Sequence, residues 1–272
     1  MAGAASTIEL SVIAPAHNEE DNVSLLVREA NDSVDALGID YEILIVDDGS
    51  TDRTLDMLRN CLESCSRLRV IRMARTPPGR GNGQSAAFHA GVRASRGRLI
   101  ALLDADLQND PADIPRMLVR MRETGADLVQ GNRSAARRDS FVRRVSSRVG
   151  FLFRRLLLGD RVRDTGCSLR VMTREVALSL PLEYRGMHRF IPVTAASLGF
   201  AVVEMPVNHR PRTAGAPKYG VWNRAFVGIP DCLAVRWMRK RRRPVEYTEV
   251  RSPEPANVSA HRDPAESARG KF

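Results

Sequence analysis

Cysteine is scarce in this chain of 272 residues, and its four cysteines show no paired spacing typical of metal ligands. Cys61 and Cys65 lie one helical turn apart, whereas Cys167 and Cys232 stand alone. The opening residues, MAGAASTIEL, lack the charged and apolar regions of a signal peptide. We therefore expect free thiols in a reducing cytoplasm rather than a disulfide-bonded framework.

Long apolar runs are also missing. Across residues 221–238 the apolar character is interrupted by Arg224, Pro230, Asp231 and Arg236. No stretch of about 20 apolar residues is therefore available to span a bilayer. We expect no transmembrane helix.

The same segment nevertheless carries an amphipathic pattern. Basic residues 239–243 follow an apolar stripe with helical spacing: Trp222, Phe226, Ile229, Leu233 and Trp237. A Trp-ended stripe beside a polybasic run is typical of a helix that lies on an anionic membrane surface. A helix packed on the sheet with a solvated tail is the alternative. Residues 244–272, with several Pro, Ser and Glu residues, are expected to form a disordered tail.

Charge is divided unevenly along the chain. Residues 1–132 carry 20 acidic and 14 basic side chains, a net charge of −6, so residues 133–272 carry 12 and 28, a net charge of +16. The basic half is expected to face something anionic, and charge alone does not separate nucleic acid from a membrane surface. Within it, residues 141–158 combine an apolar helical face with arginines, which fits either a membrane-surface helix or a core helix.

Apolar runs alternate with helical patterns along most of the chain, and 43% of its residues are hydrophobic, enough for one large α/β core. Strands are predicted at 8–14, 41–46, 68–73, 99–103, 126–131, 168–173 and 200–207. Helices are predicted at about 23–37, 51–64, 84–95 and 111–123. This alternation is typical of a mostly parallel sheet, which binds ligands beyond the carboxyl ends of its strands.

A pair of acidic side chains ends the strand predicted at 99–103. Asp104 and Asp106 are separated by one residue, so both project to the same side of an extended chain. Neighbouring carboxylates repel one another unless a cation or donors lie between them, and such oxygen ligands suit Mg²⁺ or Mn²⁺ that carries substrate phosphates. A solvated Asp-rich turn is the alternative. Other polar loops converge on the same edge, however, and one holds a second acidic pair, Asp47 and Asp48.

Seven motifs follow one another in order between residues 8 and 220. They are SVIAPAHNEEDNV at 11–23, ILIVDDGSTDRT at 43–54, NGQSAAFHAG at 82–91, LLDADLQNDP at 102–111, GNR at 131–133, DTGCSLR at 164–170 and HRPRTAGAPKYG at 209–220. Together they resemble family 2 glycosyltransferases of the GT-A fold, and within that family the polyprenyl-phosphate, dolichol-phosphate mannose synthase-like group. The resemblance implies a GT-A domain at 1–220, with a nucleotide-sugar half at about 8–132 and an acceptor half at about 133–220.

The resemblance also implies roles for individual residues. It places the nucleotide against Pro15, His17, Asn18, Glu19, Asp47, Asp48, Gly83, Gln84 and Asp104. It assigns the divalent cation, Mg²⁺ or Mn²⁺, to Asp104, Asp106 and Gln108. Candidates for binding the acceptor and the diphosphate are Arg133, Arg170, His188, Arg189, Arg210, Arg212 and Lys218. The catalytic candidates are Asp106, Asp164 and Arg133.

Acceptor chemistry limits what Asp164 must do. A lipid monophosphate is already largely anionic at neutral pH, so it needs positioning and charge screening more than deprotonation. Guanidinium groups suit both tasks because they bind phosphate through two parallel hydrogen bonds. Asp164 would act as a base or orient the nucleophile, and a capping or Arg-paired carboxylate is the alternative.

We therefore predict an inverting, metal-dependent glycosyltransferase that moves a sugar from a UDP- or GDP-sugar to a polyprenyl phosphate. It would act as a peripheral protein on the inner face of the cytoplasmic membrane, with an anionic membrane surface as a partner and without nucleic acid; the sequence also allows a homo-oligomer. One alternative is transfer to a hydroxyl acceptor, for which Asp164 would be indispensable as a base. The other is a non-catalytic basic protein that binds RNA or membrane.

Overall fold

The computed structural model describes residues 8–77, 79–133, 152, 154–211 and 221–243, without the side chains of residues 221–228. The chain divides into two units, Met1–Lys240 and Arg241–Phe272, and the fold below is that of the first. The predictions made for residues 134–151, 212–220 and 244–272 concern parts of the chain outside the described residues.

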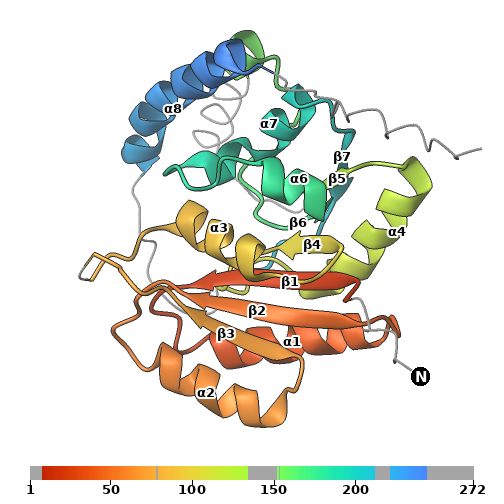
Figure 1. Ribbon diagram of the computed structural model, residues 1–272, viewed down its shortest axis with the longest axis vertical. Coiled ribbons are helices and arrows are strands. Elements are labelled where there is room, and N and C mark those ends of the chain that lie inside the picture. Colours follow the sequence, from red (N-terminus) through yellow and green to blue (C-terminus); the bar gives the residue numbers. More distant parts are fainter. Residues whose placement is uncertain (1–7, 78, 134–151, 153, 212–220, 244–272) are drawn as a thin grey trace, which may run out of the picture. The chain divides into compact units, whose positions relative to one another are not determined.

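Seven strands form one sheet in the order β3-β2-β1-β4-β6-β5-β7 (Figure 1). They are β1 (Leu10–Ala16), β2 (Tyr41–Asp47), β3 (Leu68–Arg72), β4 (Leu99–Leu102), β5 (Leu128–Asn132), β6 (Arg170–Thr173) and β7 (Val202–Pro206). Neighbouring strands are parallel except where β6 runs antiparallel to β4 and β5. The predicted α/β fold with a mostly parallel sheet is confirmed.

The described helices connect these strands. They are α1 (Val23–Asp35), α2 (Thr54–Ser64), α3 (Gln84–Ala94), α4 (Ile114–Thr124), α6 (Arg174–Ser179), α7 (Ile191–Ser197) and α8 (Val221–Arg241), with short 3₁₀ helices η1 (Pro111–Asp113) and η2 (Met187–Phe190). Helix α2 begins later than predicted because the Asp52 carboxylate accepts hydrogen bonds from the N–H and hydroxyl of Thr54 and so fixes the first turn there.

The core has two apolar layers, one on each face of the sheet. Alternate strand residues point to opposite faces, so Val12 packs beneath α1, α2 and α4 whereas Ile13 packs beneath α3, α6 and α7. Figure 1 shows α1 and α2 on one side of the strands and α3 on the other. Both layers are almost completely shielded from solvent, which gives the strand ends a rigid support.

The reversed strand β6 determines what meets at the functional edge. Arg170, the first residue of β6, pairs with Leu102, the last residue of β4. The connection 164–169 therefore reaches the sheet at the edge where the acidic pair follows β4. A strand parallel to β4 would have started at the opposite edge.

The described helices and cysteines add two findings. No helix in the described ranges combines the length and apolar character needed to cross a membrane. All four cysteines are free thiols, and only Cys65 is not buried.

Candidate active site

Asp104 is the centre of a hydrogen-bonded group at the carboxyl end of β4. Its Oδ1 accepts a hydrogen bond from Gln84 Nε2, at the start of α3, and its Oδ2 accepts one from the hydroxyl of Ser168, just before β6. Gln84 Nε2 also lies 3.4 Å from Ser168 Oγ. Three segments far apart in the sequence thus fix one carboxylate.

The second acidic residue, Asp106, lies close enough to Asp104 to perturb its titration. Burial and the Asp106 carboxylate raise the pKa of Asp104 to about 6, against the opposing effects of the Ser168 hydrogen bond and of the Arg133 and Arg170 charges. Both aspartates retain some solvent contact. The arrangement concentrates negative charge at an accessible edge.

Backbone strain accompanies this acidic turn. Leu107 is buried and has φ 59, in the left-handed region that a branched side chain rarely adopts. The turn allows the N–H of Gln108 to donate to Asp106 Oδ1 at 3.2 Å. Strain of this kind persists where the surrounding structure holds it, and it is concentrated at functional sites.

The donor set fits a hard divalent cation. Within the part of the chain that the structure describes, no three or more His, Cys, Asp and Glu side chains group as metal ligands, so the protein does not supply a closed cage there. Mg²⁺ and Mn²⁺ at phosphate-transfer sites need only one or two carboxylates, with phosphate oxygens and water completing the shell. Asp104 and Asp106, with the amide oxygen of Gln108 nearby in sequence, match that requirement.

The loops after β1 and β2 are joined into one surface. The Nδ1 atom of His17 lies 2.9 Å from the carbonyl oxygen of Asp48. Asn18 donates its N–H to Ser50 Oγ at 3.0 Å and accepts the Thr51 N–H at 2.8 Å. These bonds hold two nucleotide-binding candidates, His17 and Asn18, beside the second acidic pair.

Asp48 links those loops to the start of α3. Its Oδ1 accepts the N–H of Asn82 at 2.8 Å, and its Oδ2 accepts the N–H of Gly83 at 2.7 Å. Gly81, with φ 62, passes so close that a Cβ atom there would lie 2.6 Å from the Asp48 carbonyl oxygen. The contacts run on through Gln84 to Asp104, so the predicted nucleotide and metal residues form one continuous group.

The remaining nucleotide candidates lie at the base of these loops, where the loops leave the sheet. Pro15 lies within β1 and pairs with Val46. Glu19 donates its N–H to the Thr54 hydroxyl at 2.8 Å. Asp47 is fully buried, and its Oδ1 accepts the Ser50 N–H at 3.0 Å. The structure thus places all of them at this edge.

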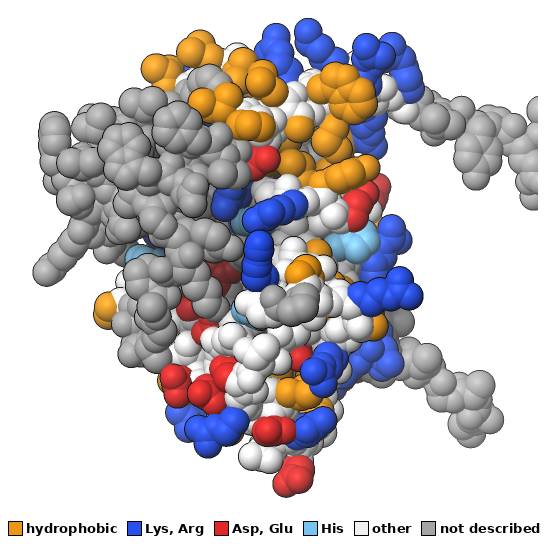
Figure 2. Space-filling view, turned by 90° about the vertical axis from the view of Figure 1, so that its left-hand side faces the viewer, with side chains coloured by type: hydrophobic (Ala, Val, Ile, Leu, Met, Phe, Trp, Pro, Cys, Tyr) orange, Lys and Arg blue, Asp and Glu red, His pale blue; other side chains and the backbone are white. Residues whose placement is uncertain are grey.

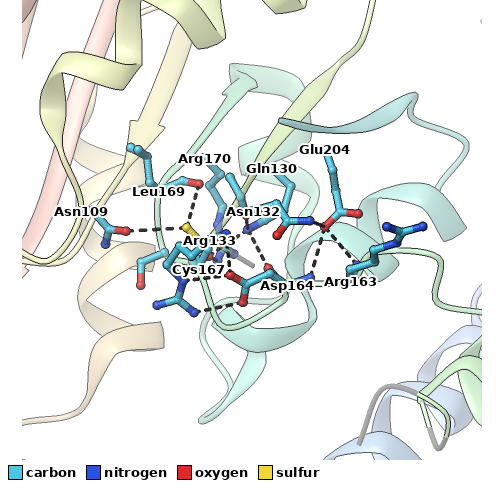
Figure 3. Close-up of polar contacts among 12 residues, drawn as sticks. Asn109, Gln130, Asn132, Arg133, Arg163, Asp164, Cys167, Leu169, Arg170 and Glu204 are labelled. Carbon is cyan, nitrogen blue, oxygen red and sulfur yellow. Dashed lines mark hydrogen bonds and ion pairs between the residues drawn. The ribbon is translucent and has the colours of Figure 1, made fainter. Parts of the chain in front are cut away.

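Two of the catalytic candidates, Asp164 and Arg133, form a buried ion pair (Figure 3). Arg133 donates from Nε and from its backbone N–H to Asp164 Oδ2, at 2.8 and 3.0 Å, and from Nη2 to Oδ1 at 3.0 Å. Although burial opposes the charged form, this carboxylate raises the pKa of Arg133 above its ordinary value. Asp164 is therefore an Arg-paired carboxylate, the alternative that the sequence left open.

Glu204 on β7 fixes the loop that carries Asp164. Its Oε1 accepts the N–H groups of Arg163 and Asp164, at 3.0 and 3.1 Å, and the side-chain amide of Asn132 at 3.3 Å. Figure 3 shows Glu204 at one end of this network and Arg133 nearer its centre. Glu204 thus fixes the main chain at Asp164, and Arg133 fixes the Asp164 carboxylate.

Arg170 and His188 lie deeper than a phosphate-binding role would suggest. Arg170 is buried and donates to the carbonyl oxygens of His188, at 2.9 Å from Nη1, and of Cys167. Burial lowers the pKa of Arg170 to about 10. His188 Nδ1 lies 2.7 Å from Ser85 Oγ, which also accepts the His188 N–H at 3.1 Å. Burial, with the charges of Arg189 and Arg170, lowers the pKa of His188 to about 3, so its imidazole is neutral.

Arg210 holds the start of the predicted acceptor loop against the acidic turn. It pairs with Glu29 at 2.6 Å and Asp110 at 2.7 Å, and its N–H donates to the Gln108 carbonyl oxygen at 3.0 Å. Arg189 is partly exposed. The two further candidates, Arg212 and Lys218, lie outside the described residues.

Sequence reasoning missed Ser168, Asn82, Ser85 and Glu204 as members of this group. Ser168, Asn82 and Ser85 lie inside the motifs at 164–170 and 82–91, but a motif does not show which side chain each of them contacts. Glu204 lies outside all seven motifs, and its partners, Asn132, Arg163 and Asp164, are distant in the sequence.

The site thus combines a mostly parallel sheet with a paired-acid turn at its carboxyl edge, joined to polar loops from β1 and β2, which is the arrangement expected of the glycosyltransferase class that the sequence resembles. Comparison with known proteins gives the family. The sequence profile of glycosyl transferase family 2 matches residues 11–179, and the chain belongs to that family.

Relatives of known name share much of the sequence. The chain is 36% identical over 245 residues to dodecaprenyl-phosphate galacturonate synthase of Rhizobium johnstonii, a match over 89% of this chain and 70% of the relative. It is 38% identical over 213 residues to undecaprenyl-phosphate 4-deoxy-4-formamido-L-arabinose transferase of Edwardsiella ictaluri, over 78% of this chain and 63% of the relative. The chain thus spans less than two thirds of the second relative's length.

Solved structures share the fold. Glucosyl-3-phosphoglycerate synthase from Mycobacterium tuberculosis, in complex with Mn²⁺, uridine diphosphate and glucosyl-3-phosphoglycerate, superposes with a TM-score of 0.60 at 23% identity, over 85% of this chain and 80% of that chain. Its complex with phosphoglyceric acid gives a TM-score of 0.61 at 21% identity, with the same coverage. At this level of identity the likeness concerns the fold.

Proposed function

We propose that this protein transfers a sugar from a nucleotide-sugar donor to a polyprenyl phosphate. The observation that carries the proposal is the continuous contact group from His17 through Asp48 and Gln84 to Asp104, which brings the predicted nucleotide and metal residues to one edge. The names of the relatives, both polyprenyl-phosphate sugar transferases, supply the acceptor class.

Asp104, Asp106 and Gln108 would hold Mg²⁺ or Mn²⁺ with the donor diphosphate. The bound cation would neutralise charge that develops on the departing nucleoside diphosphate. The Mn²⁺ and uridine diphosphate in the structural neighbour are consistent with this assignment. The protein's own part is to orient: Gln84 and Ser168 fix the Asp104 carboxylate, and the strained turn at Leu107 directs the residues that follow.

The nucleoside would lie on the surface formed by the loops after β1 and β2. His17, Asn18 and Asp48 border that surface, whereas Pro15, Glu19 and Asp47 support it. Gly83 and Gln84 close the side nearest the diphosphate, where backbone N–H groups at the start of α3 favour negative charge. The donor would be a UDP- or GDP-sugar.

The state of Asp164 favours a phosphate acceptor. Both of its carboxylate oxygens accept hydrogen bonds from Arg133, so taking up a proton would weaken a buried ion pair. A hydroxyl acceptor must lose a proton during the reaction, whereas a phosphate oxygen attacks as an anion. In this proposal Arg133 and Asp164 position the acceptor, with Arg189, Arg212 and Lys218 as further phosphate-binding candidates, and the displacement inverts the anomeric carbon.

Arg170, His188 and Arg210 would act by positioning. Arg170 holds the main chain at His188, and Arg210 ties the start of the 212–220 loop to the acidic turn. The enzyme would work as a peripheral protein on the inner face of the cytoplasmic membrane, where a polyprenyl phosphate is available. Homo-oligomerisation stays a prediction.

A donor panel with radiolabelled UDP- and GDP-sugars and a polyprenyl phosphate tests the proposal. We expect one donor to move label into the organic phase, with dependence on Mg²⁺ or Mn²⁺ and loss of transfer in Asp104→Asn. Asp56→Asn, an exposed pair member on α2, serves as the matched control and should transfer normally. Label that moves only to added sugars or glycans would establish the hydroxyl-acceptor alternative. Calorimetry that finds no nucleoside diphosphate binding with Mn²⁺ would favour the non-catalytic one.

A further inference from the structure

The outward face of α8 carries an apolar stripe. Ile229, Leu233 and Trp237 follow one another at intervals of four residues, and their exposed fractions are 44%, 51% and 61%. At 3.6 residues per turn this spacing places the three side chains along one side of the helix. Exposed apolar side chains are common singly, but an aligned set marks an interaction surface.

The inward face of α8 is packed, which fixes the direction in which the stripe points. Cys232 and Val235 lie in a small core with Leu158, Met187 and Phe190. Arg236 donates to the carbonyl oxygen of Leu157 at 2.8 Å, and Arg239 donates to the carbonyl oxygen of Leu158. The stripe is therefore on the side of α8 away from the protein core.

A second apolar pair belongs to the segment that α8 contacts, in which residues 152 and 154–158 are helical. Leu152 and Leu156, one helical turn apart, are 54% and 74% exposed. The next residues, Leu157 and Leu158, supply the carbonyl oxygens and core contacts that hold α8. We call Leu152, Leu156, Ile229, Leu233 and Trp237 the two-helix apolar surface.

Cationic side chains border this surface. Arg236, Arg239 and Lys240 are exposed, although the guanidinium groups of Arg236 and Arg239 also donate to main-chain carbonyl oxygens. The sequence continues with three further arginines, 241–243. Figure 2 shows hydrophobic and basic side chains gathered at the end of the molecule where α8 lies, whereas acidic side chains are more frequent at the other end.

We propose that the two-helix apolar surface docks on an anionic lipid bilayer, with its leucine and tryptophan side chains in the interface and the cations against lipid headgroups. Apolar side chains beside Lys and Arg match the chemistry of such a membrane surface. Nucleic acid would use the cations but would leave the exposed apolar side chains without a partner. A second copy of the chain would bring like charges together, because a symmetric dimer places the same patch on both sides.

A single layer of packed side chains joins α8, which carries the docking surface, to the segment that carries two acceptor candidates. Met187 and Phe190, which pack against α8, flank His188 and Arg189 on η2. Asp231 of α8 also lies against Gly186, where a Cβ atom would be 2.8 Å from Asp231 Oδ2. Docking would therefore place the His188 segment behind α8, one helix away from the bilayer. That link to the acceptor, unlike docking itself, rests on the proposed function.

Vesicle co-sedimentation of the full chain tests the docking. The wild type should bind phosphatidylglycerol vesicles, bind phosphatidylcholine vesicles at least about tenfold more weakly, and be released as salt rises towards about 1 M. The double variant Leu233→Glu/Trp237→Glu should lose about tenfold or more in affinity for the anionic vesicles. Val119→Glu, at a 50% exposed apolar position on α4, is the matched control and should bind as the wild type does.

Three outcomes would overturn the proposal. They are equal binding by the double variant and the wild type, a dimer that dissociates only in the double variant, and RNA binding that the double variant loses. A short-chain, water-soluble prenyl phosphate separates this failure from failure of the proposed function. With that acceptor and no vesicles, the double variant should transfer sugar at the wild-type rate. If the wild type binds vesicles but transfers sugar neither to the polyprenyl phosphate nor to its short-chain analogue, the proposed function is wrong and the proposed docking is retained.

Discussion

Replacing Asp164 by Asn should show whether its main task is to hold Arg133. The wild-type carboxylate accepts three hydrogen bonds from Arg133, at 2.8, 3.0 and 3.0 Å, and both residues are about nine-tenths buried. Asn retains one acceptor oxygen but presents an N–H₂ group to the Arg133 guanidinium, whose positive charge then lacks a partner. Removing one member of a buried pair lowers the free energy of unfolding by about 3–5 kcal/mol. Because Asn keeps one oxygen, we expect a loss of about 3 kcal/mol.

A double-mutant cycle isolates the pair from its surroundings. Arg133→Met should also cost about 3 kcal/mol, because it leaves the Asp164 carboxylate without its cation. The double variant Arg133→Met/Asp164→Asn should cost about the same as either single variant, because no unpaired charge remains. The coupling energy between the two positions is then about 3 kcal/mol, at the upper end of the usual range.

Urea unfolding followed by far-ultraviolet circular dichroism measures these free energies. Tryptophan fluorescence is less suitable because both tryptophans belong to α8. The exposed pair Asp56 and Arg59, with 66% and 65% of each side chain exposed, provides a matched cycle whose coupling should be about 0.5 kcal/mol or less. Coupling in the buried pair no larger than in this control would refute the reasoning.

The same variant addresses the chemistry. With a phosphate acceptor, folded Asp164→Asn protein should keep measurable transfer, since no proton has to be removed. Complete loss of transfer with unchanged nucleotide binding and folding would instead identify Asp164 as an indispensable base.

Three further predictions concern stability. The pKa of His188 falls from 6.5 to about 3 on folding, so the folded state binds fewer protons than the unfolded state between these values, and the free energy of unfolding decreases as pH drops through that range. Between about pH 7 and about pH 5, the free energy of unfolding of His188→Asn should therefore fall by about 1–2 kcal/mol less than that of the wild type. Glu42→Gln should cost about 2–4 kcal/mol in urea unfolding, because it removes the charge of a buried carboxylate that pairs with Arg69 and also accepts from Ser11 Oγ at 2.6 Å. Calorimetric nucleotide binding should stay unchanged, because Glu42 lies at the opposite edge of the sheet. Gly91→Ala places a Cβ atom 2.4 Å from Ile13 Cγ2, so thermal unfolding should show a loss of about 1–3 kcal/mol.

Much of the first half of the fold could be predicted because its signals are local. Each strand from β1 to β4 is an apolar run followed by a polar loop and, in most cases, an amphipathic helix, and the buried residues of α1 recur at helical spacing. The edge at which Asp48 and Asp104 lie followed from that alternation alone. Helices α6 and α7, with six and seven residues, are too short for periodicity to separate them from loops.

Side-chain partnerships at the site could not be predicted in the same way, because they depend on strand order. The sequence indicated that Asp104 ends a strand but gave no sign that Gln84 and Ser168 would hold its carboxylate. Both partners belong to segments whose distance from β4 is set by the neighbours that β4 acquires in the sheet. Periodicity describes one element at a time and contains no information on neighbours.

The reversal of β6 accounts for the most important of these partnerships. Arg133 directly follows β5 and Asp164 precedes β6, and antiparallel neighbours place the end of one strand beside the start of the next. The same reversal, acting across the β4 and β6 pair, brings Ser168 to Asp104. With β6 parallel instead, residues 164–169 would enter at the far edge and neither the ion pair nor the Asp104 clamp could form. The direction of one four-residue strand therefore decides whether residues 133 and 164–170 meet the sheet edge that carries Asp104.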